Sequence, residues 1–165
     1  MMTMKVSGKR KALICGISGQ DGAYLAQLLL SKDYEVFGTS RDAQMSSFAL
    51  LHQLKIADQI KTLSMSLTDF RSVFQILSKV QPDEIYNLAG QSSVGLSFDQ
   101  PVESFESISI ATINLLEALR TVSPNARFYN SGSSECFGET SVPADESTPF
   151  RPRSPYAVAK AAAIG

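Results

Sequence analysis

The sequence predicts an α/β protein built on a doubly wound parallel sheet. Five apolar runs of strand length alternate with helical patterns from residue 11 onward, as parallel strands joined by crossover helices require. A glycine-rich turn joins the first of these runs to the first helical pattern. Because such crossovers are right-handed, we expect the strand order 3-2-1-4-5.

The first half of the chain contains three of the expected strands, one ending at residue 14 and two covering residues 35–38 and 60–65. An amphipathic helix begins near residue 21 and carries Leu25, Leu28 and Leu29 on its apolar side. We expect it to end at Lys32 and Asp33, because aspartate tolerates the left-handed conformation better than most residues. A second helical pattern covers residues 48–54.

The second half repeats the alternation with strands over residues 84–88 and 126–130. A helical pattern over residues 73–77 is ended by Pro82, and Pro101 opens a long helix before the last strand. We predict that the apolar side of this long helix carries Val102, Phe105, Ile113, Leu116 and Leu119. The five strands and their helices together amount to a Rossmann-like sheet that lacks its last strands.

Composition limits the classes of function. The 165 residues carry 15 basic and 16 acidic side chains, a net charge of −1, so no broad basic surface is available for nucleic acid. No apolar run approaches the roughly 20 residues that a membrane span needs. We expect a flexible N-terminus over residues 1–10 and a single domain over residues 11–165.

The chain has one histidine, His52, and two cysteines, Cys15 and Cys136, which lie far apart in the sequence. These residues form no metal-ligand cluster, so we expect no metal site. Isolated cysteines are typical of reduced thiols in a cytoplasmic protein.

Three glycines mark the turn after the first strand. Gly16, Gly19 and Gly22 recur every third residue, where they allow a tight turn and a close approach of the backbone to a ligand. The helix that follows offers unpaired N–H groups and a partial positive charge to a pyrophosphate. An ordinary tight turn is the alternative, but the place of the turn between strand and helix favours a dinucleotide site.

The end of the second strand indicates which dinucleotide is bound. Arg41 stands about twenty residues after the glycines, where NAD-binding proteins of this class have an acidic residue. A guanidinium can hold a 2′-phosphate through two parallel hydrogen bonds, which favours NADP. The alternative is a solvated surface arginine, and Asp42 places a negative charge beside it.

Two further stretches carry candidate catalytic residues. Ser133 and Glu135 follow the fifth strand and, in an extended chain, would point to the same side. Ser154 can cap a helix in which Tyr156 and Lys160, four residues apart, are neighbours on one face. A lysine ammonium beside a phenol stabilises the phenolate, so this pair can act as a base.

At this point the sequence resembles the N-terminal half of the GDP-mannose 4,6-dehydratase family, within the extended short-chain dehydrogenase/reductase superfamily. The similar stretches are residues 12–22, 82–92, 94–101, 134–138 and 148–156. Gly-Gln-Asp-Gly at 19–22 and Pro-Arg-Ser-Pro-Tyr at 152–156 are the narrowest signatures among them. Members of the family continue for roughly as many residues again, and that part holds the sugar nucleotide.

The resemblance implies a reaction and roles for the catalytic candidates. Tyr156 would take the C4 hydroxyl proton of GDP-mannose while a hydride passes to NADP. Glu135 would remove the C5 proton and assist the loss of water from C6, with Ser133 bonded near C4. Hydride return to C6 gives GDP-4-keto-6-deoxymannose. Lys160 would also hold the nicotinamide ribose, and we expect this chain alone to be inactive.

The resemblance also implies a set of cofactor contacts and a homo-oligomer in the full-length form. The implied contacts are Gly16, Ile17, Ser18, Gly19, Gln20, Asp21, Gly22, Arg41, Ser66, Leu67, Leu88, Ala89, Gly90, Gln91, Ser92, Tyr156 and Lys160. The chain departs from the family at Ser66, where an aspartate is usual, at Ser93, where a histidine is common, and at Glu103, where a tyrosine is usual. Ser133 stands in place of a threonine and keeps the hydroxyl.

Two other functions remain open from the sequence. A related nucleotide-sugar epimerase or reductase would share the glycine turn and the Tyr–Lys pair. Glu135 favours dehydration, because an epimerase that only oxidises C4 needs no carboxylate there. A non-catalytic remnant that binds a dinucleotide is the second alternative.

Overall fold

A computed structural model describes residues 8–164 and shows a five-stranded, fully parallel sheet in the order β3-β2-β1-β4-β5. The predicted strand order is confirmed. The strands are β1 (Lys11–Cys15), β2 (Glu35–Ser40), β3 (Lys61–Ser64), β4 (Glu84–Asn87) and β5 (Arg127–Asn130). Of the N-terminus expected to be flexible, residues 1–7 lie outside the described part, and residues 8–10 have no regular structure.

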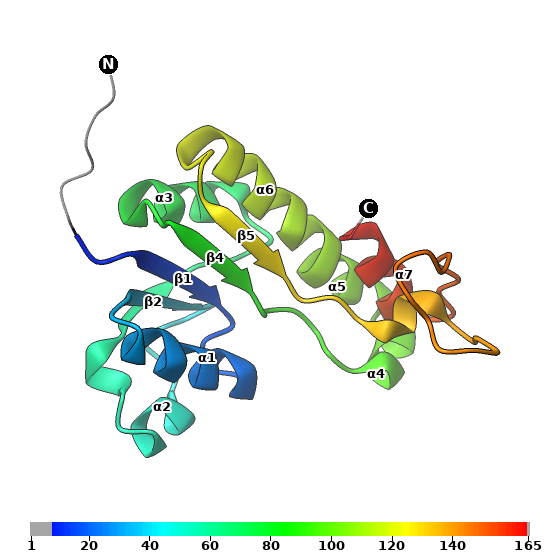
Figure 1. Cartoon of the computed structure of the whole chain (residues 1–165), viewed down its shortest axis with the longest axis horizontal. Helices are drawn as coiled ribbons and strands as arrows, with labels where there is room; N and C mark the ends of the chain where they lie inside the picture. The colour runs from blue at the N-terminus through cyan, green and yellow to red at the C-terminus, as the bar shows by residue number, and fades with distance from the viewer. Residues whose placement is uncertain (1–7, 165) are drawn as a thin grey trace.

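Helices cover the two faces of the sheet and gather beyond the carboxyl ends of the strands. The helices are α1 (Gln20–Ser31), α2 (Ala49–Gln53), α3 (Phe70–Val80), α4 (Val94–Asp99), α5 (Pro101–Phe105), α6 (Ala111–Val122) and α7 (Pro155–Ala162). A π-helical segment, η2 (Glu106–Ile110), joins α5 to α6, and short 3-10 turns cover η1 (Ala57–Gln59) and η3 (Ser134–Phe137). In Figure 1, α1 and α2 lie on one face, α3 and α6 on the other, and α4 and α7 beyond the strand ends.

Strand β1 supplies the centre of the core on both faces. Because side chains alternate along a strand, Leu13 packs with α3 and α6, whereas Ala12 and Ile14 pack with α1. All three residues are fully buried. A strand buried on both faces reads as a continuous apolar run, which is why the sequence marks β1 so clearly.

Helix α1 differs from its predicted apolar face. Leu28 is 50% exposed, and the buried residues are the small ones, Gly22, Ala23 and Ala26, together with Leu29. Small side chains allow the helix to approach the sheet closely, so the larger leucine is left outside. The predicted end of the helix is confirmed, since Asp33 takes a left-handed conformation with φ 63°.

The long helix predicted after Pro101 is present but interrupted, and the side that was predicted to face the core faces solvent. Val102, Phe105, Ile113 and Leu116 point outward, with exposures between 39% and 68%, and only Leu119 of the predicted set is buried. The inner face carries Leu115 and Ala118 and, beside them, small hydroxyl residues. These are Ser104, Ser109 and Thr112, whose hydroxyls donate to the carbonyl oxygens of Gln100, Ala159 and Ile108.

Buried hydroxyls that donate to helix carbonyls satisfy their own polar atoms, so they can occupy a core position that hydropathy assigns to leucine. Helix α4 (Val94–Asp99), which the sequence did not predict, precedes the break at Pro101. Among residues 8–164, no helix has both the length and the apolar character to cross a bilayer.

Candidate cofactor and catalytic site

An open cavity of about 1070 Å³ lies at the carboxyl ends of β1, β2 and β4. Its walls come from the glycine turn and the start of α1, the loops after β2, β3 and β4, and the segment around α5. The lining residues are Gly16, Ser18, Gly19, Gln20, Asp21, Gly22, Thr39, Ser40, Arg41, Asp42, Met45, Ser46, Met65, Ser66, Leu67, Thr68, Leu88, Ala89, Gly90, Gln91, Ser92, Glu103, Glu106 and Ser107. This is where ligands bind in open α/β sheets.

The glycine turn leaves no room for side chains at two positions. Gly16 has a φ of 87°, and a Cβ on it would lie 3.0 Å from the backbone nitrogen of Ala89. A Cβ on Gly22 would overlap the carbonyl oxygen of Gly16 and lie 3.0 Å from the Cα of Ile17. The first turn of α1 therefore packs directly against the strand end. Among the residues that the structure describes, no side chain caps this helix at Gly19, which leaves its first N–H groups open to a ligand.

The loop after β2 is held in a compact shape by Asp42. Its Oδ1 accepts the backbone N–H groups of Gln44 at 3.0 Å and Met45 at 3.1 Å, and its carbonyl accepts the Ser46 hydroxyl at 2.6 Å. Asp42 is therefore engaged within its own loop. Arg41 is exposed at the cavity wall and makes no ion pair within residues 8–164, which leaves its guanidinium open to an anion.

Ser133 and Glu135 follow β5, but the extended geometry expected for them is wrong. Ser133 is the N-cap of η3, and its hydroxyl accepts the backbone N–H of Glu135 at 3.3 Å. The chain turns tightly here, because a serine hydroxyl offers the backbone a local partner in place of a continued strand. The Glu135 side chain lies in solvent.

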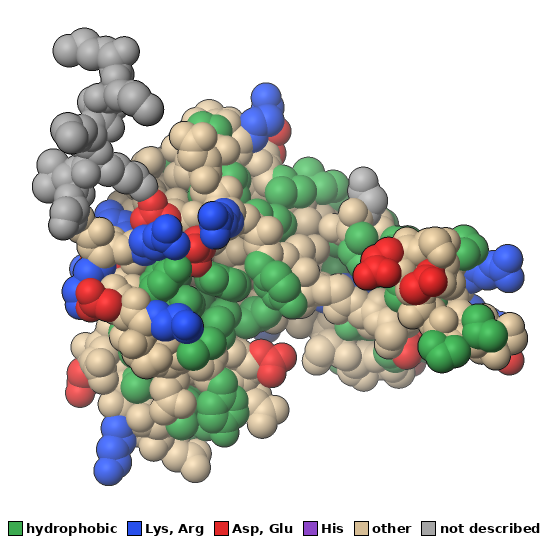
Figure 2. Space-filling model, viewed as in Figure 1, with side chains coloured by type: hydrophobic (Ala, Val, Ile, Leu, Met, Phe, Trp, Pro, Cys, Tyr) green, Lys and Arg blue, Asp and Glu red, His purple; other side chains and the backbone are tan. Residues whose placement is uncertain are grey.

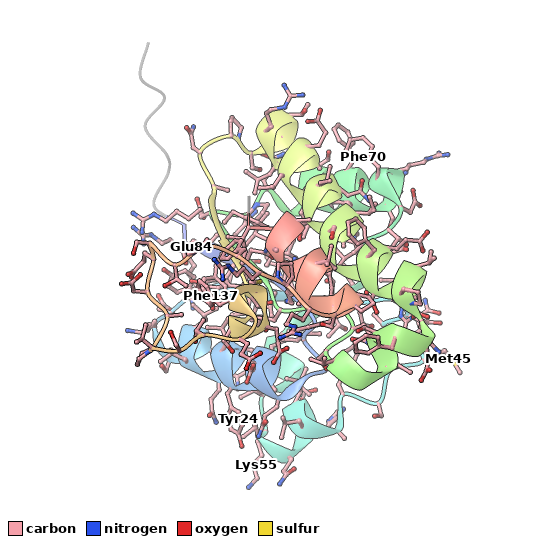
Figure 3. The ribbon with its side chains drawn as sticks, turned by 90° about the vertical axis from the view of Figure 1, so that its right-hand side faces the viewer. Tyr24, Met45, Lys55, Phe70, Glu84 and Phe137 are labelled. Atoms are coloured by element: carbon pink, nitrogen blue, oxygen red, sulfur yellow. The ribbon has the colours of Figure 1, made fainter. Side chains whose placement is uncertain are left out.

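Helix α7 carries Tyr156 and Lys160 on one face, as predicted. Ser154 caps the helix by accepting the Ala157 N–H at 3.0 Å. Tyr156 is 8% exposed and Lys160 is 7% exposed, and the ammonium nitrogen lies 5.8 Å from the centre of the Tyr156 ring. In Figure 3 this helix faces the viewer, with the turn that carries Phe137 beside it.

The Lys160 ammonium is fixed from the end of β5. Its Nζ donates to the backbone oxygen of Ser131 at 2.9 Å and to the Ser131 hydroxyl at 3.2 Å. Burial lowers the pKa of Lys160 from its usual value, and interaction with the Cys136 thiol opposes that shift.

The structure brings most of the implied cofactor residues together. All of them line the cavity except Ile17, Tyr156 and Lys160. Ile17 is fully buried beneath the turn, where its side chain contacts Gly38. Tyr156 packs against Ile108, which in turn lies beside Gly90 of the cavity wall, so α7 adjoins the cavity through the π-helical segment.

Other lining residues escaped the sequence prediction. Ser40 precedes Arg41 at the end of β2, and its hydroxyl oxygen lies 3.0 Å from that of Ser46 in the following loop. Their place at and just after the end of the second strand was the available signal. Glu106 and Ser107 belong to the π-helical segment, and the Ser107 hydroxyl accepts the Gln91 N–H at 3.3 Å. No sequence signal marked these two, because a π-helical segment has no simple hydropathy pattern.

A parallel sheet with a close-packed glycine turn at its centre and a Tyr–Lys helix beyond β5 defines a Rossmann protein of the short-chain dehydrogenase/reductase type. The family model described as GDP-mannose 4,6 dehydratase matches residues 13–164. The chain belongs to this family.

Relatives of known name are similar over part of their length. GDP-mannose 4,6-dehydratase of Vibrio cholerae is 41% identical over 160 residues, a match that covers 92% of this chain and 43% of the relative. The Drosophila melanogaster GDP-mannose 4,6 dehydratase is 43% identical over 164 residues, covering 93% of this chain and 41% of the relative. This chain therefore spans less than half the length of either relative.

Solved structures support the same fold. The UDP-glucose 4-epimerase of Thermus thermophilus, determined in complex with NAD, superimposes with a TM-score of 0.81 at 27% identity. The superposition covers 93% of this chain and 48% of the epimerase.

Proposed function

We propose that this chain is the cofactor-binding part of an NADP-dependent GDP-mannose 4,6-dehydratase, a carbon–oxygen lyase. The observation that carries the proposal is a glycine-turn cavity next to a buried Tyr–Lys pair in a chain of this family. Residues 11–165 form the NADP-binding domain, and a domain that binds the sugar nucleotide lies outside this chain. We place the protein in the cytoplasm, where the free, buried thiols of Cys15 and Cys136 stay reduced.

The glycine turn fits a dinucleotide. At Gly16 and Gly22 the cavity wall is bare backbone, and side chains there would collide with neighbouring backbone atoms. A pyrophosphate can thus reach the open N–H groups at the start of α1, where the helix dipole favours negative charge. The relative solved with NAD has the same fold, which supports a nicotinamide dinucleotide.

Arg41 and its neighbouring hydroxyls favour NADP over NAD. The guanidinium can take two oxygens of a 2′-phosphate, and Ser40 and Ser46 line the same wall. Asp42 opposes an anion less than its charge suggests, because its carboxylate already accepts two backbone N–H groups. Glu103 also lines the cavity, and its charge lowers the affinity for any anionic cofactor.

In the reaction, NADP supplies a reversible hydride store. Tyr156 takes the proton of the C4 hydroxyl, and the Lys160 ammonium nearby stabilises the negative charge on the phenol oxygen. Glu135 removes the proton at C5 and returns a proton to the hydroxyl that leaves C6. Ser133 donates a hydrogen bond near C4. Glu135 is exposed in this chain, and a sugar-binding domain would exclude water from it.

The cofactor assignment is tested by calorimetry on this chain with NADP and NAD. We expect NADP to bind more tightly, and Arg41→Ala to reduce the preference by about tenfold or more, because a charge-assisted pair contributes roughly 1.5–3 kcal/mol. Arg71→Ala is the matched control, since Arg71 is exposed on α3 and does not line the cavity. Equal affinities of the unmutated chain for NADP and NAD would contradict the assignment.

The reaction is tested by joining residues 1–165 to the C-terminal part of the Vibrio cholerae relative. We expect the hybrid, once shown to be folded and loaded with NADP, to convert GDP-mannose to GDP-4-keto-6-deoxymannose without net reduction of NADP. Tyr156→Phe should lower turnover by about 10²- to 10⁴-fold, the usual contribution of an acid–base group. Residues 1–165 alone should give no product. A hybrid that epimerises a sugar nucleotide without eliminating water would establish the epimerase alternative.

The outward apolar face of α5 and α6 supports self-association. The exposed apolar residues of this helix pair follow one another at intervals of three, eight and three positions; they are Val102, Phe105, Ile113 and Leu116. The π-helical segment adds one residue to the middle interval, so all three intervals are close to whole helical turns and the four side chains lie on one side. A contiguous exposed apolar stripe on a helix pair is typical of a subunit interface. Light scattering should report an oligomer that Ile113→Glu dissociates and that Val142→Glu, on an exposed loop, leaves intact.

A further inference from the structure

Helix α7 is short, and side-chain hydrogen bonds join it to neighbouring elements. It covers eight residues, Pro155–Ala162. The Ser109 hydroxyl donates to the carbonyl oxygen of Ala159 at 2.9 Å, and Lys160 reaches out to Ser131. A helix of this length is marginal without such contacts, so the placement of its catalytic side chains depends on them.

One of these contacts comes from Asn130, the last residue of β5. Its Nδ2 donates to the carbonyl oxygen of Ala163 at 3.2 Å, and its Oδ1 accepts the Nδ2 of Asn87 at 2.9 Å. Asn87 closes β4 and is only 3% exposed. Ala163 is the C-cap of α7, where helix carbonyls lack partners inside the helix. The amide pair thus joins the ends of two strands to the end of α7.

The next residue completes a clamp with two contact points. Ser131 holds the Lys160 ammonium, and its own backbone N–H donates to the carbonyl oxygen of Asn87 at 3.1 Å. Two consecutive residues, Asn130 and Ser131, therefore hold the backbone end of α7 and its lysine at once. Both are tied to the same residue of β4, so the clamp cannot shift without breaking strand contacts.

We propose that Asn130, paired with Asn87, is a positioning residue that fixes the end of α7 and thereby keeps the Lys160 ammonium between Ser131 and the Tyr156 ring. Its bearing on catalysis rests on the proposed function. An asparagine side chain suits this role, because its amide accepts from Asn87 and donates to Ala163 at the same time and is long enough to reach both. Leucine has a similar size and can do neither.

The clamp has a measurable consequence for Lys160. With α7 fixed, the ammonium is buried and its pKa lies below the usual value. When the end of α7 is released, water reaches the ammonium, and the pKa moves back upward. Loss of packing elsewhere in the domain would not move this value while the fold remains intact.

The test compares Asn130→Leu with Asn125→Leu in this chain without cofactor. Asn125 lies exposed in the turn before β5 and provides the same chemical change away from α7. Lysine-labelled NMR, assigned with Lys160→Met, should show a higher pKa of Lys160 in Asn130→Leu only. Amide exchange in α7 should rise at least tenfold there, while exchange in α1 stays unchanged. Asn130→Gln, which keeps an amide, should recover part of both effects.

A binding measurement separates this inference from the proposed function. NADPH should bind Asn130→Leu at least fivefold more weakly, whereas 2′,5′-ADP, which lacks the nicotinamide ribose, should bind as before. If the unmutated chain binds neither, the proposed function fails, and the pKa of Lys160 still decides the role of Asn130.

The inference would be overturned if Asn130→Leu changed neither the pKa of Lys160 nor the amide exchange in α7. Should Asn130→Leu not fold, Asn130→Ser replaces it, since a serine leaves space for water and is too short to reach Ala163. Global unfolding of both variants would also overturn it, because a clamp on α7 predicts local loosening.

Discussion

Strands β1 and β5 carry the two parts of the site, and they differ in how they are held. Strand β1 pairs with β2 on one side and β4 on the other, and four of its five residues are buried. Within residues 8–164, strand β5 pairs with β4 alone, and its residues alternate between exposed and half-buried. Figure 2 shows hydrophobic side chains at the surface over β4 and β5, where Tyr129 is 54% exposed.

This difference carries over to the chemistry that each strand positions. The glycine turn after β1 is fixed by backbone packing, with no space at Gly16 or Gly22. The helix α7 is held by the packing of Tyr156 and Ala159 against Ile108 and, in addition, by side-chain hydrogen bonds. These hydrogen bonds involve Ser154, Lys160 and Asn130. We therefore expect the glycine turn to fail when a side chain is added, and α7 to loosen when a single polar contact is removed.

The largest expected effect breaks the packing after β1. Gly22→Ala places a methyl group against the carbonyl of Gly16 and should lower the free energy of unfolding by about 2–3 kcal/mol, since backbone must move. Dinucleotide binding should be lost with it. Gly95→Ala is the control, because its nearest neighbour would be 3.9 Å away. Urea unfolding measures both, and equal stabilities of the two variants would contradict the prediction.

A second effect concerns the thiol at the end of β1. Burial raises the pKa of Cys15 to about 12 from its usual 9.0. Its contribution to stability is complete below pH 9 and is lost as the pH rises toward 12, because only the unfolded thiol ionises there. Between pH 8 and 10 the unmutated chain should lose about 1.4 kcal/mol relative to Cys15→Ala. If the free energies of unfolding of the two proteins changed in parallel with pH, the Cys15 thiol would not be shielded from solvent.

A smaller effect on stability is expected at the N-terminus of α7. Ser154→Ala removes the cap of α7 and should cost about 1 kcal/mol of unfolding free energy. Because α7 depends on such single contacts, amide exchange should rise in α7 and stay constant in α1. Ser147→Ala, in an exposed loop, serves as the control. A uniform rise of exchange across both helices would mean that α7 is no more loosely held than α1.

The smallest effect on stability is expected from Lys160, and its pH dependence has the opposite sign to that of Cys15. Burial lowers the pKa of Lys160 below 10.5, so the folded protein releases this proton before the unfolded chain does. The cost of holding the buried ammonium is present at neutral pH and disappears as the pH rises toward 10.5. The stability of the unmutated chain should therefore increase relative to Lys160→Met over that range. A difference that moves the other way with rising pH would contradict the direction of the shift.

The strand order followed from the sequence because the central strands β1 and β2 are buried apolar runs and the crossovers between parallel strands have one hand. The side of each helix that packs against the sheet did not follow from the sequence. Leu28 and Ile113 look like core residues, yet small residues such as Ala26 and Thr112 take the inner positions. Close approach of a helix to the sheet and internal bonding of hydroxyls decide those faces, and hydropathy measures neither.

The site was predictable where it depends on local sequence. The glycine turn and the Tyr156–Lys160 spacing are encoded within a few residues, and the cavity and the helix face agree with them. Ser133 shows the limit of prediction from local sequence. Its hydroxyl accepts the backbone N–H of Glu135, and the chain turns there and does not continue as a strand. Asn130 illustrates another, because its partners at 87 and 163 come from distant parts of the sequence.

The π-helical segment at Glu106–Ile110 sets the rotational phase of the whole α5–α6 rod. Each residue advances an α-helix by about 100°, so deleting one residue there would make the rod regular and turn α5 by that angle against α6. Glu103, which now lines the cavity, would rotate away from it, while Leu115 and Leu119 would stay in the core. We therefore expect a one-residue deletion in this segment to take Glu103 out of the cavity wall and to leave the sheet that forms the floor of the cavity unaltered.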